Sequence, residues 1–197
     1  MLIIKIGNVS ELSDSDIAFW KQNSEAGRVV SVLRKRLGTD RKRSILGDIS
    51  ATFLIRSQFG YENSVLCHDP HGRPYVKDCP FFISISHSEN KAICVLSDKP
   101  VGIDIEKVRK VGLKTKEKIC SGKELAYIGD DDERFFEVWT AKEAYSKFTG
   151  EGVAAILRGV YTDQSEKTVE GIPFKVFKTD GYVYSLVSEN NFEEVII

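Results

Sequence analysis

The sequence has few cysteines and no long apolar run. Its four cysteines are Cys67, Cys79, Cys94 and Cys120. They form no CxxC pair and no dense framework, so we expect free thiols in a reducing compartment. The apolar start at residues 1–4 is broken by Lys5, and no later run approaches the roughly 20 apolar residues of a membrane span. These absences predict a cytoplasmic protein with neither a signal peptide nor a membrane-spanning helix.

An excess of charge of one sign is also absent. The chain has 28 Lys and Arg residues against 29 Asp and Glu residues, a formal net charge of -1. No long-range field would draw such a chain onto nucleic acid or a membrane, so we expect neither as a partner. Any anion-binding site must therefore be local. The 42% hydrophobic and 29% charged residues are typical of a folded, soluble protein.

One segment leaves a metal alternative open. Cys67, His68, Asp69 and His71 are close in the sequence, and Cys79 follows. Their spacing is not that of a structural zinc site, and Asp-Pro followed by His-Gly-Arg-Pro is typical of a turn. We favour the turn over zinc at this segment.

Hydrophobic periodicity predicts helices and strands in alternating blocks. The expected helical segments are two helices within residues 13–37, separated near Gly27, and residues 40–58, 114–128 and 133–148. The expected strands are residues 2–6, 81–86, 92–96, 101–106, 174–177, 182–187 and 192–197, with another near Tyr161. Within residues 40–58, Phe53 falls on the apolar stripe and Asp48 lies off it.

This order of elements predicts an α+β fold made of two similar halves. We place the halves at residues 1–99 and 100–197, meeting near Lys99 and Pro100. The sequence contains no strong internal repeat, so this division follows from the element order alone.

The strand at residues 101–106 carries two acids. Because strand side chains alternate, Val101, Ile103 and Ile105 should enter the core while Gly102, Asp104 and Glu106 share the opposite face. The two carboxylates would then stand about 7 Å apart, beside a glycine that leaves room for a ligand. This is the outline of a site for a hard cation such as Mg²⁺. The alternative is a strand whose acidic face is simply solvated.

The helix expected at residues 133–148 has one lysine on its apolar side. Phe135, Val138 and Tyr145 form an apolar arc on the helical wheel, and Lys142 falls inside it. A lysine is out of place there unless its ammonium group reaches a partner. Glu143 and Lys147 lie one turn apart near the edge of the arc, where a surface ion pair is the simple alternative to catalysis.

Three further positions could bind an anion. His87 lies where a strand gives way to the turn at residues 88–90, and Arg73 lies in a tight loop before Pro74. Arg43 is on the helix at residues 40–58. Each of these residues taken alone is typical of a solvated surface.

The order of these motifs resembles that of the Sfp-type 4′-phosphopantetheinyl transferase family. The motifs are Arg43-Ser-Ile-Leu-Gly-Asp, Gly72-Arg-Pro, Ile85-Ser-His-Ser, Gly102-Ile-Asp-Ile-Glu and Trp139-Thr-Ala-Lys-Glu-Ala-Tyr-Ser-Lys. The resemblance covers residues 43–152, a little over half of the chain. Its last two motifs are highly specific for this family.

The resemblance implies a monomer of two pseudo-twofold-related halves that acts on coenzyme A. Such an enzyme transfers the 4′-phosphopantetheine group to a serine of an apo acyl or peptidyl carrier protein and releases adenosine 3′,5′-bisphosphate. The resemblance does not indicate which carrier or pathway is served.

The resemblance also implies roles for individual residues. Asp104 and Glu106 would hold Mg²⁺, with Glu143 as a third ligand or as the base. Lys147 would meet the pyrophosphate of coenzyme A. The residues that would contact the rest of coenzyme A are Arg43, Arg73, Pro74, Ser86 and His87, and His87 is also a catalytic candidate. Glu124 resembles another acidic position near the site, and the basic residues near the start, Arg28, Arg34, Lys35 and Arg36, have no clear counterparts.

Two other functions remain as alternatives. The chain could be a catalytically silent homologue that binds coenzyme A or docks a carrier protein, although Asp104, Glu106 and Glu143 are all present. It could also use water as the nucleophile and hydrolyse the pyrophosphate of coenzyme A, because one metal site can serve several reactions.

Overall fold

The computed structural model describes most of the chain, namely residues 1–60, 64–152, 154, 156, 159–190, 192 and 195–196. The chain divides into two compact units, which are treated separately below. The first unit is Met1–Lys99 together with Phe192–Ile197, and the second is Pro100–Asn191. The sequence analysis placed residues 192–197 in the second half, whereas here they group with the first unit.

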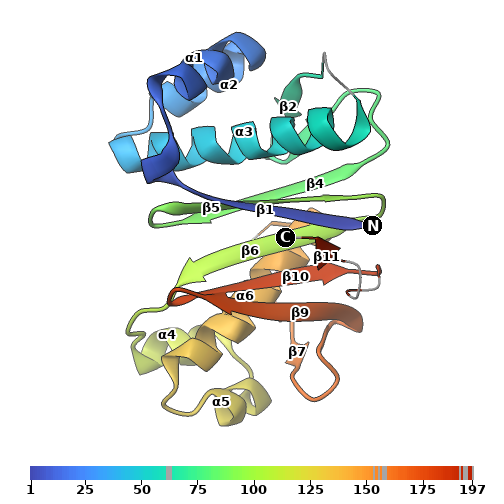
Figure 1. The fold of residues 1–197 in the computed structure, drawn as a ribbon. Coiled ribbons are helices and arrows are strands. Elements are labelled where there is room, and N and C mark those ends of the chain that lie inside the picture. Colours follow the sequence, from blue (N-terminus) through green and yellow to red (C-terminus); the bar gives the residue numbers. More distant parts are fainter. Residues whose placement is uncertain are drawn as a thin grey trace. The chain divides into compact units, whose positions relative to one another are not determined.

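The first unit is a sheet covered by helices (Figure 1). Its helices are η1 (Val9–Glu11), α1 (Asp14–Asn23), α2 (Ala26–Leu33) and α3 (Gly38–Phe59). Its strands are β1 (Leu2–Asn8), β2 (Leu66–His68), β3 (Pro74–Val76), β4 (Phe82–Ser88), β5 (Lys91–Ser97) and β11 (Val195–Ile196). The larger sheet has the order β11-β1-β5-β4, and β2 pairs with β3. Helix α3 lies on one face of the larger sheet, and α1 and α2 contact α3.

Two clusters of apolar side chains hold the first unit together. The larger cluster lies between α3 and the strands, where Ile55, Cys94 and Leu96 are almost fully buried. The smaller cluster joins α1, α2 and α3 through Trp20, Val32 and Ile45. Full burial of an apolar side chain such as Ile55 or Leu96 stabilises the fold by about 1.5–3 kcal/mol relative to exposure.

The break between the first two helices differs from the expected one. Helix α1 ends at the C-cap residue Ser24 and α2 begins at Ala26, so Gly27 lies inside α2. Ser13 and Asp16 form a capping box at the start of α1, which fixes where this helix begins. The prediction of two helices is confirmed, and their break lies at Ser24 and Glu25, two residues before Gly27.

The expected stripe on α3 is wrong at two positions. Asp48 is 2% exposed and accepts hydrogen bonds from Trp20 Nε1 at 3.0 Å and Arg28 Nε at 2.9 Å. Phe53 is instead 52% exposed, with the Lys5 ammonium 4.5 Å from its ring centroid. The periodicity of one helix could not reveal the donors on α1 and α2 that make burial of Asp48 favourable.

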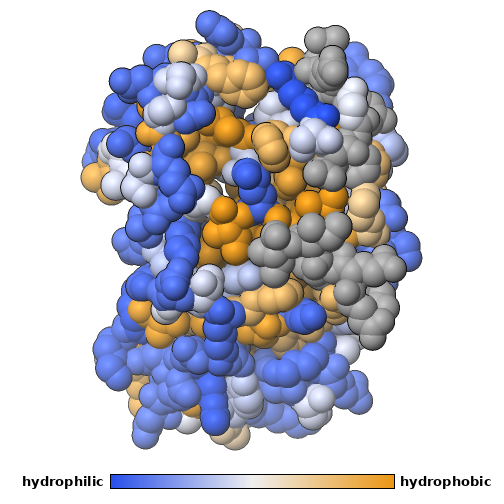
Figure 2. All heavy atoms as spheres, viewed as in Figure 1, coloured by the Kyte–Doolittle hydropathy of each residue, from blue (hydrophilic) through white to orange (hydrophobic). Residues whose placement is uncertain are grey.

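The second unit is a five-stranded sheet with one long helix against it (Figure 1). Its strands are β6 (Val101–Lys107), β7 (Thr162–Asp163), β8 (Thr168–Val169), β9 (Ile172–Thr179) and β10 (Tyr182–Ser188). Its helices are α4 (Leu113–Ile119), α5 (Gly122–Ile128) and α6 (Asp132–Thr149). The strand order is β6-β10-β9-β8-β7, and α6 contacts β6 and β10 most extensively. The surface over α4 and α5 is largely hydrophilic in the face drawn in Figure 2.

Helix α6 is buried on several sides. Ala141 and Ala144 pack in one apolar cluster with Phe174 of β9, while Phe136 and Val138 pack in another. Asp131 caps the start of the helix by accepting the N–H groups of residues 133 and 134, and Gly150 ends it with φ = 80°. The helix therefore fixes the positions of its polar side chains with respect to β6.

Two expected segments are divided differently in the structure. Residues 114–128 form two helices, because the chain is extended at Cys120 and Ser121 starts α5 with a capping box to Glu124. Of the strand expected at 192–197, Val195 and Ile196 form β11, which pairs in parallel with β1. Residues 193, 194 and 197 lie outside the described residues.

The α+β fold class is confirmed by the helices and sheets of both units. The pseudo-twofold relation of two halves stays a prediction. None of the helices in the described part of the chain combines the length and the apolar character that crossing a bilayer requires.

Candidate active site

Strand β6 places its two acids on the side of α6. Val101, Ile103 and Ile105 are fully buried, and the opposite face carries Gly102 and Asp104. The apolar residues are buried as predicted, but the opposite face is buried as well at Gly102 and Asp104. Asp104 is only 5% exposed, so the alternative of a solvated acidic face is wrong for this residue.

Gly102 makes room for a helix and not for a ligand. A Cβ atom at this position would lie 1.9 Å from the backbone oxygen of Ala144 and 2.7 Å from the backbone nitrogen of Phe148. The expectation that this glycine leaves room for a ligand is therefore wrong. The close approach brings α6 against β6, and this contact sets the distance between the acids of β6 and the polar side chains of α6.

Lys147 of α6 pairs with Asp104 and not with its helical neighbour Glu143. Its ammonium group lies 2.7 Å from Asp104 Oδ1 and 3.0 Å from the carbonyl oxygen of Ile103. The Lys147 side chain is 29% exposed, so the pair is open to solvent on one side. The surface ion pair considered for Glu143 and Lys147 is replaced by a contact between helix and strand.

Glu143 lies in a field of negative charge. Burial, with the Asp104 and Glu106 carboxylates, raises the pKa of Glu143 to about 7. The Lys147 ammonium group acts in the opposite direction. The three predicted metal ligands are therefore near enough to interact electrostatically. A carboxyl group with a pKa near 7 can accept or release a proton at neutral pH.

Glu106 has a partner that the sequence analysis missed. Arg109 Nη1 lies 3.1 Å from Glu106 Oε2, and both side chains are partly exposed. The signal available in the sequence was only a basic residue three positions after an acidic one. Because the segment after a strand has no fixed period, this spacing does not predict a contact.

The carboxylates of Asp104, Glu106 and Glu143 suit a hard cation, but they are not arranged as a complete set of metal ligands. Among the described residues, no group of three or more His, Cys, Asp or Glu side chains is arranged to hold a metal ion. The donors at Asp104, Glu106 and Glu143 are all carboxylate oxygens, which Mg²⁺ prefers. Burial is the main cause of the raised pKa of Glu143, and repulsion from Asp104 and Glu106 adds to it; a divalent cation would relieve this repulsion. The chemistry of this donor set therefore fits Mg²⁺.

Lys142 has the partner that its position on the helix required. It is 1% exposed, and its ammonium group lies 2.9 Å from Glu124 Oε2 and 2.8 Å from the carbonyl oxygen of Ile119. Glu124 Oε1 also accepts hydrogen bonds from the N–H and hydroxyl groups of Thr162, both at 2.8 Å. The structure thus places Glu124 in a closed network that joins α5 to α6 and β7.

In the first unit, Arg43 and His87 lie on the same side of the sheet. Ile85 contacts Gly47 of α3, and His87 shares the face of Ile85 because it is two residues further along β4. Arg43 on α3 donates to the carbonyl oxygen of Glu89, just beyond β4, and pairs with Asp40. Ser86 must point to the opposite face of the strand, so it does not share this side.

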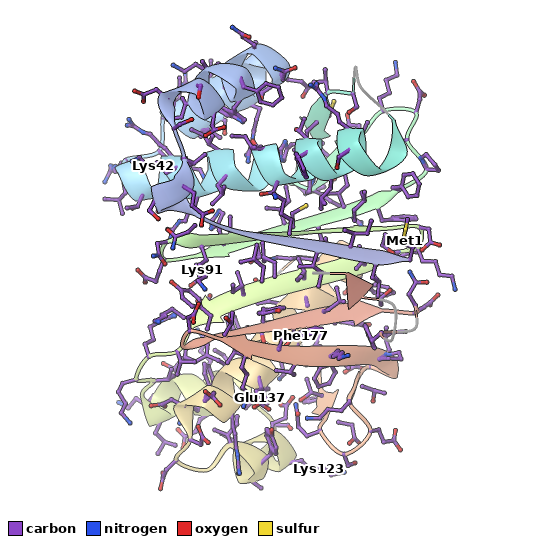
Figure 3. All side chains as sticks on the ribbon, in the orientation of Figure 1. Met1, Lys42, Lys91, Lys123, Glu137 and Phe177 are labelled. Atoms are coloured by element: carbon purple, nitrogen blue, oxygen red, sulfur yellow. The ribbon has the colours of Figure 1, made fainter. Side chains whose placement is uncertain are left out.

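Among the basic residues near the start, the structure distinguishes Lys35. Its ammonium group donates to Ser44 Oγ, next to Arg43, at 2.6 Å. Burial and the positive charge of Arg28 lower the pKa of Lys35. Arg28 is instead occupied by Asp48, and Lys42 is exposed at the start of α3 (Figure 3).

Arg73 and Pro74 border a hollow in the first unit. Asp69 accepts the N–H groups of His71 and Arg73, both at 2.8 Å, which confirms the predicted turn. The hollow has a volume of about 380 Å³. Its lining includes the aromatic residues Tyr75, Phe81 and Phe82.

Comparisons with known proteins agree with this arrangement. Residues 100–188 match the 4′-phosphopantetheinyl transferase superfamily. The chain is 28% identical over 173 residues to the 4′-phosphopantetheinyl transferase gsp of Aneurinibacillus migulanus, covering 84% of this chain and 72% of that protein. It is 31% identical to the transferases psf-1 of Bacillus pumilus and Sfp of Bacillus subtilis, over 129 and 123 residues. These matches cover 61% and 58% of this chain and 55% of each relative.

The matched region contains β6 and α6 and therefore the four residues of the candidate active site. Over residues 100–188, a little under half of the chain, the sequence is similar to the 4′-phosphopantetheinyl transferase superfamily. The resemblance to the Sfp-type members, drawn from the motifs alone, is confirmed, as is the prediction of an enzyme of this transferase class. The chain spans only about half of the length of two of these relatives.

Proposed function

We propose that this protein transfers the 4′-phosphopantetheine group of coenzyme A to a serine of an apo acyl or peptidyl carrier protein. The reaction requires Mg²⁺, and adenosine 3′,5′-bisphosphate is released. The protein acts on both substrates as a monomer. The observation that supports this proposal best is the set of three interacting carboxylates and one lysine at the contact of β6 and α6.

Asp104, Glu106 and Glu143 supply oxygen ligands for Mg²⁺. The bound ion would neutralise charge on the pyrophosphate during transfer. Asp104 is buried and held by Lys147, so its carboxylate has one fixed orientation. Glu106 is more exposed and can adjust its position. One rigid and one adjustable ligand suit an ion that also keeps water and phosphate oxygens as ligands.

Glu143 takes part in proton transfer, and Lys147 stabilises negative charge. Glu143, a carboxylate beside the site of attack, accepts the proton of the carrier serine as the serine oxygen attacks phosphorus. Lys147 reaches the same strand through Asp104 and presents an ammonium group to the leaving phosphate. Both residues lie on one turn of α6, so their spacing is fixed before substrate binds.

The first unit would supply contacts to the nucleotide part of coenzyme A. Arg43, Lys35 and His87 are basic groups on one side of this unit and suit a phosphate group. The aromatic hollow beside Arg73 and Pro74 suits an adenine ring. Ser86, on the other face of β4, would contact a different part of the ligand from His87.

The transfer can be tested by intact mass measurement of a panel of apo carrier proteins incubated with coenzyme A and Mg²⁺. The wild-type protein should add one phosphopantetheine group to at least one carrier, and EDTA should stop the reaction. Glu143→Gln should lower the rate by about 100-fold or more, because a positioned base contributes that much. The matched control is Glu133→Gln, an exposed glutamate on the same helix that pairs with Lys178, and it should leave the rate unchanged.

The outcomes separate the proposed function from its alternatives. Binding of coenzyme A without modification of any carrier would indicate a silent homologue. Cleavage of coenzyme A in the absence of a carrier would indicate a hydrolase. A rate that EDTA does not change would contradict the role given to Mg²⁺.

A further inference from the structure

Arg109 is an exposed cation that pairs with one of the proposed metal ligands. Its Nη1 atom lies 3.1 Å from Glu106 Oε2 and 3.1 Å from the carbonyl oxygen of Lys107. Its guanidinium carbon is 5.0 Å from the centroid of the Phe136 ring. The side chain is 55% exposed, against 23% for Glu106. A protein cation thus neutralises the oxygen at which a divalent ion would bind.

The second cation in this site is held more firmly. Lys147 projects from the rigid helix α6 and bonds both to Asp104 and to the carbonyl oxygen of Ile103. Arg109 follows the end of β6 and forms an exposed ion pair, which typically contributes less than about 1 kcal/mol. Of the two cations, Arg109 is therefore the one that can be displaced at little cost.

The surroundings of Arg109 allow its side chain to move while the backbone stays in place. A cavity of about 330 Å³ lies beside Glu106, lined by Arg109, Phe136 and Trp139 among others. The backbone next to Arg109 is held by a hydrogen bond from the N–H of Val111 to Asp132 Oδ1 at 3.4 Å. Asp132 also pairs with the buried Lys116 at 3.0 Å. A displaced guanidinium group can remain over the Phe136 ring.

We propose that Arg109 competes with the divalent ion for Glu106 and so sets the affinity of the site for that ion. The guanidinium group neutralises Glu106 in the metal-free protein and leaves Oε2 when the ion binds. This inference rests on the proposed function, since it takes Glu106 as a metal ligand. Arg109 is a residue that determines ion affinity and not a catalytic residue.

The test is a titration of the whole chain with Mn²⁺, in which electron paramagnetic resonance measures free Mn²⁺ without coenzyme A or carrier. Arg109→Ala should bind Mn²⁺ about two- to fivefold more tightly than the wild type, the range expected for release from an exposed ion pair. Arg109→Lys should lie between the two. Raising the ionic strength should shrink the difference, because salt screens exposed pairs.

The chain offers a closely matched control in Arg134. This residue pairs with Asp131 three positions away, is 52% exposed and lies 5.4 Å from the Tyr127 ring centroid. Arg134→Ala removes a similar cation and a similar ring contact elsewhere in the second unit. Its Mn²⁺ affinity should equal that of the wild type.

A second variant distinguishes failure of this inference from failure of the proposed function. If Asp104→Asn weakens Mn²⁺ binding but Arg109→Ala has no effect or also weakens it, the competition by Arg109 is overturned and the metal site stands. If Asp104→Asn leaves binding unchanged, or the wild type binds no Mn²⁺, the metal assignment fails and the role of Arg109 is overturned with it.

Discussion

Helix α6 forms two lysine–carboxylate pairs that differ in how fully their charges are balanced. Lys142 and Glu124 are each 1% exposed, and both Glu124 oxygens are occupied by hydrogen bonds from Lys142, Ser121 and Thr162. Burial alone would raise the pKa of Glu124, but these bonds outweigh it and the pKa is lowered. The ionised form is therefore the stable one in this network.

The other pair, Lys147 with Asp104, lies near a third charged group, Glu143, whose carboxylate Lys147 offsets only in part. There one ammonium group faces Asp104 while Glu143 lies close by with its pKa raised to about 7. Two lysines on the same helix thus form one closed pair and one open pair. The closed pair stabilises the fold, and the open pair leaves charge that a substrate or an ion can complete.

The largest expected effect is on stability at the closed pair. Lys142→Met should lower the free energy of unfolding by about 3–5 kcal/mol, because it leaves Glu124 buried without its cation. Lys147→Met should cost less than about 2 kcal/mol, since water reaches that pair. The chain has one tryptophan in each unit, Trp20 and Trp139, so urea unfolding followed by fluorescence in a Trp20→Phe background reports the second unit. Equal losses for the two variants would contradict the comparison.

A smaller effect is expected in the pH dependence of stability, and the two glutamates should act with opposite sign. The lowered pKa of Glu124 gives stability that is present above the unfolded pKa of about 4.5 and is lost as the pH falls through the folded value. The raised pKa of Glu143 has the opposite effect. Its contribution to stability is present below a pH of about 4.5 and is lost as the pH rises through about 7.

Gln variants of the two residues separate these contributions. Glu143→Gln should gain stability relative to the wild type between about pH 5 and about pH 8, measured by urea midpoints. The stability of Glu124→Gln should fall less in acid than that of the wild type, because the variant lacks the carboxylate whose protonation destabilises the protein. Parallel pH profiles for the two variants would show that the two sites do not differ as described.

The sequence predicted which residues of β6 and α6 are buried or need a partner, but it did not predict which residues they contact. Alternation along β6 correctly separated the apolar residues from Gly102 and Asp104, and the position of Lys142 on the apolar arc correctly required a partner. The partner itself, Glu124, lies on a different helix, so no period of α6 could identify it.

The burial of Asp104 and the environment of Asp48 also depended on tertiary contacts. Asp104 is buried because α6 approaches β6 at Gly102. The sequence analysis had instead expected this glycine to leave room for a ligand. Asp48 is buried because Trp20 and Arg28 come from two other helices. In each case a buried carboxylate became acceptable only through donors distant in the sequence, which local patterns do not encode.

The most direct test of the open site is a carbon-13 NMR titration of the Glu143 carboxyl group, assigned by loss of its signal in Glu143→Gln. We predict a pKa of about 7 in the metal-free protein and a clear fall when Mg²⁺ is added, because the ion replaces repulsion with attraction. A pKa near 4.5 that Mg²⁺ does not change would contradict the account.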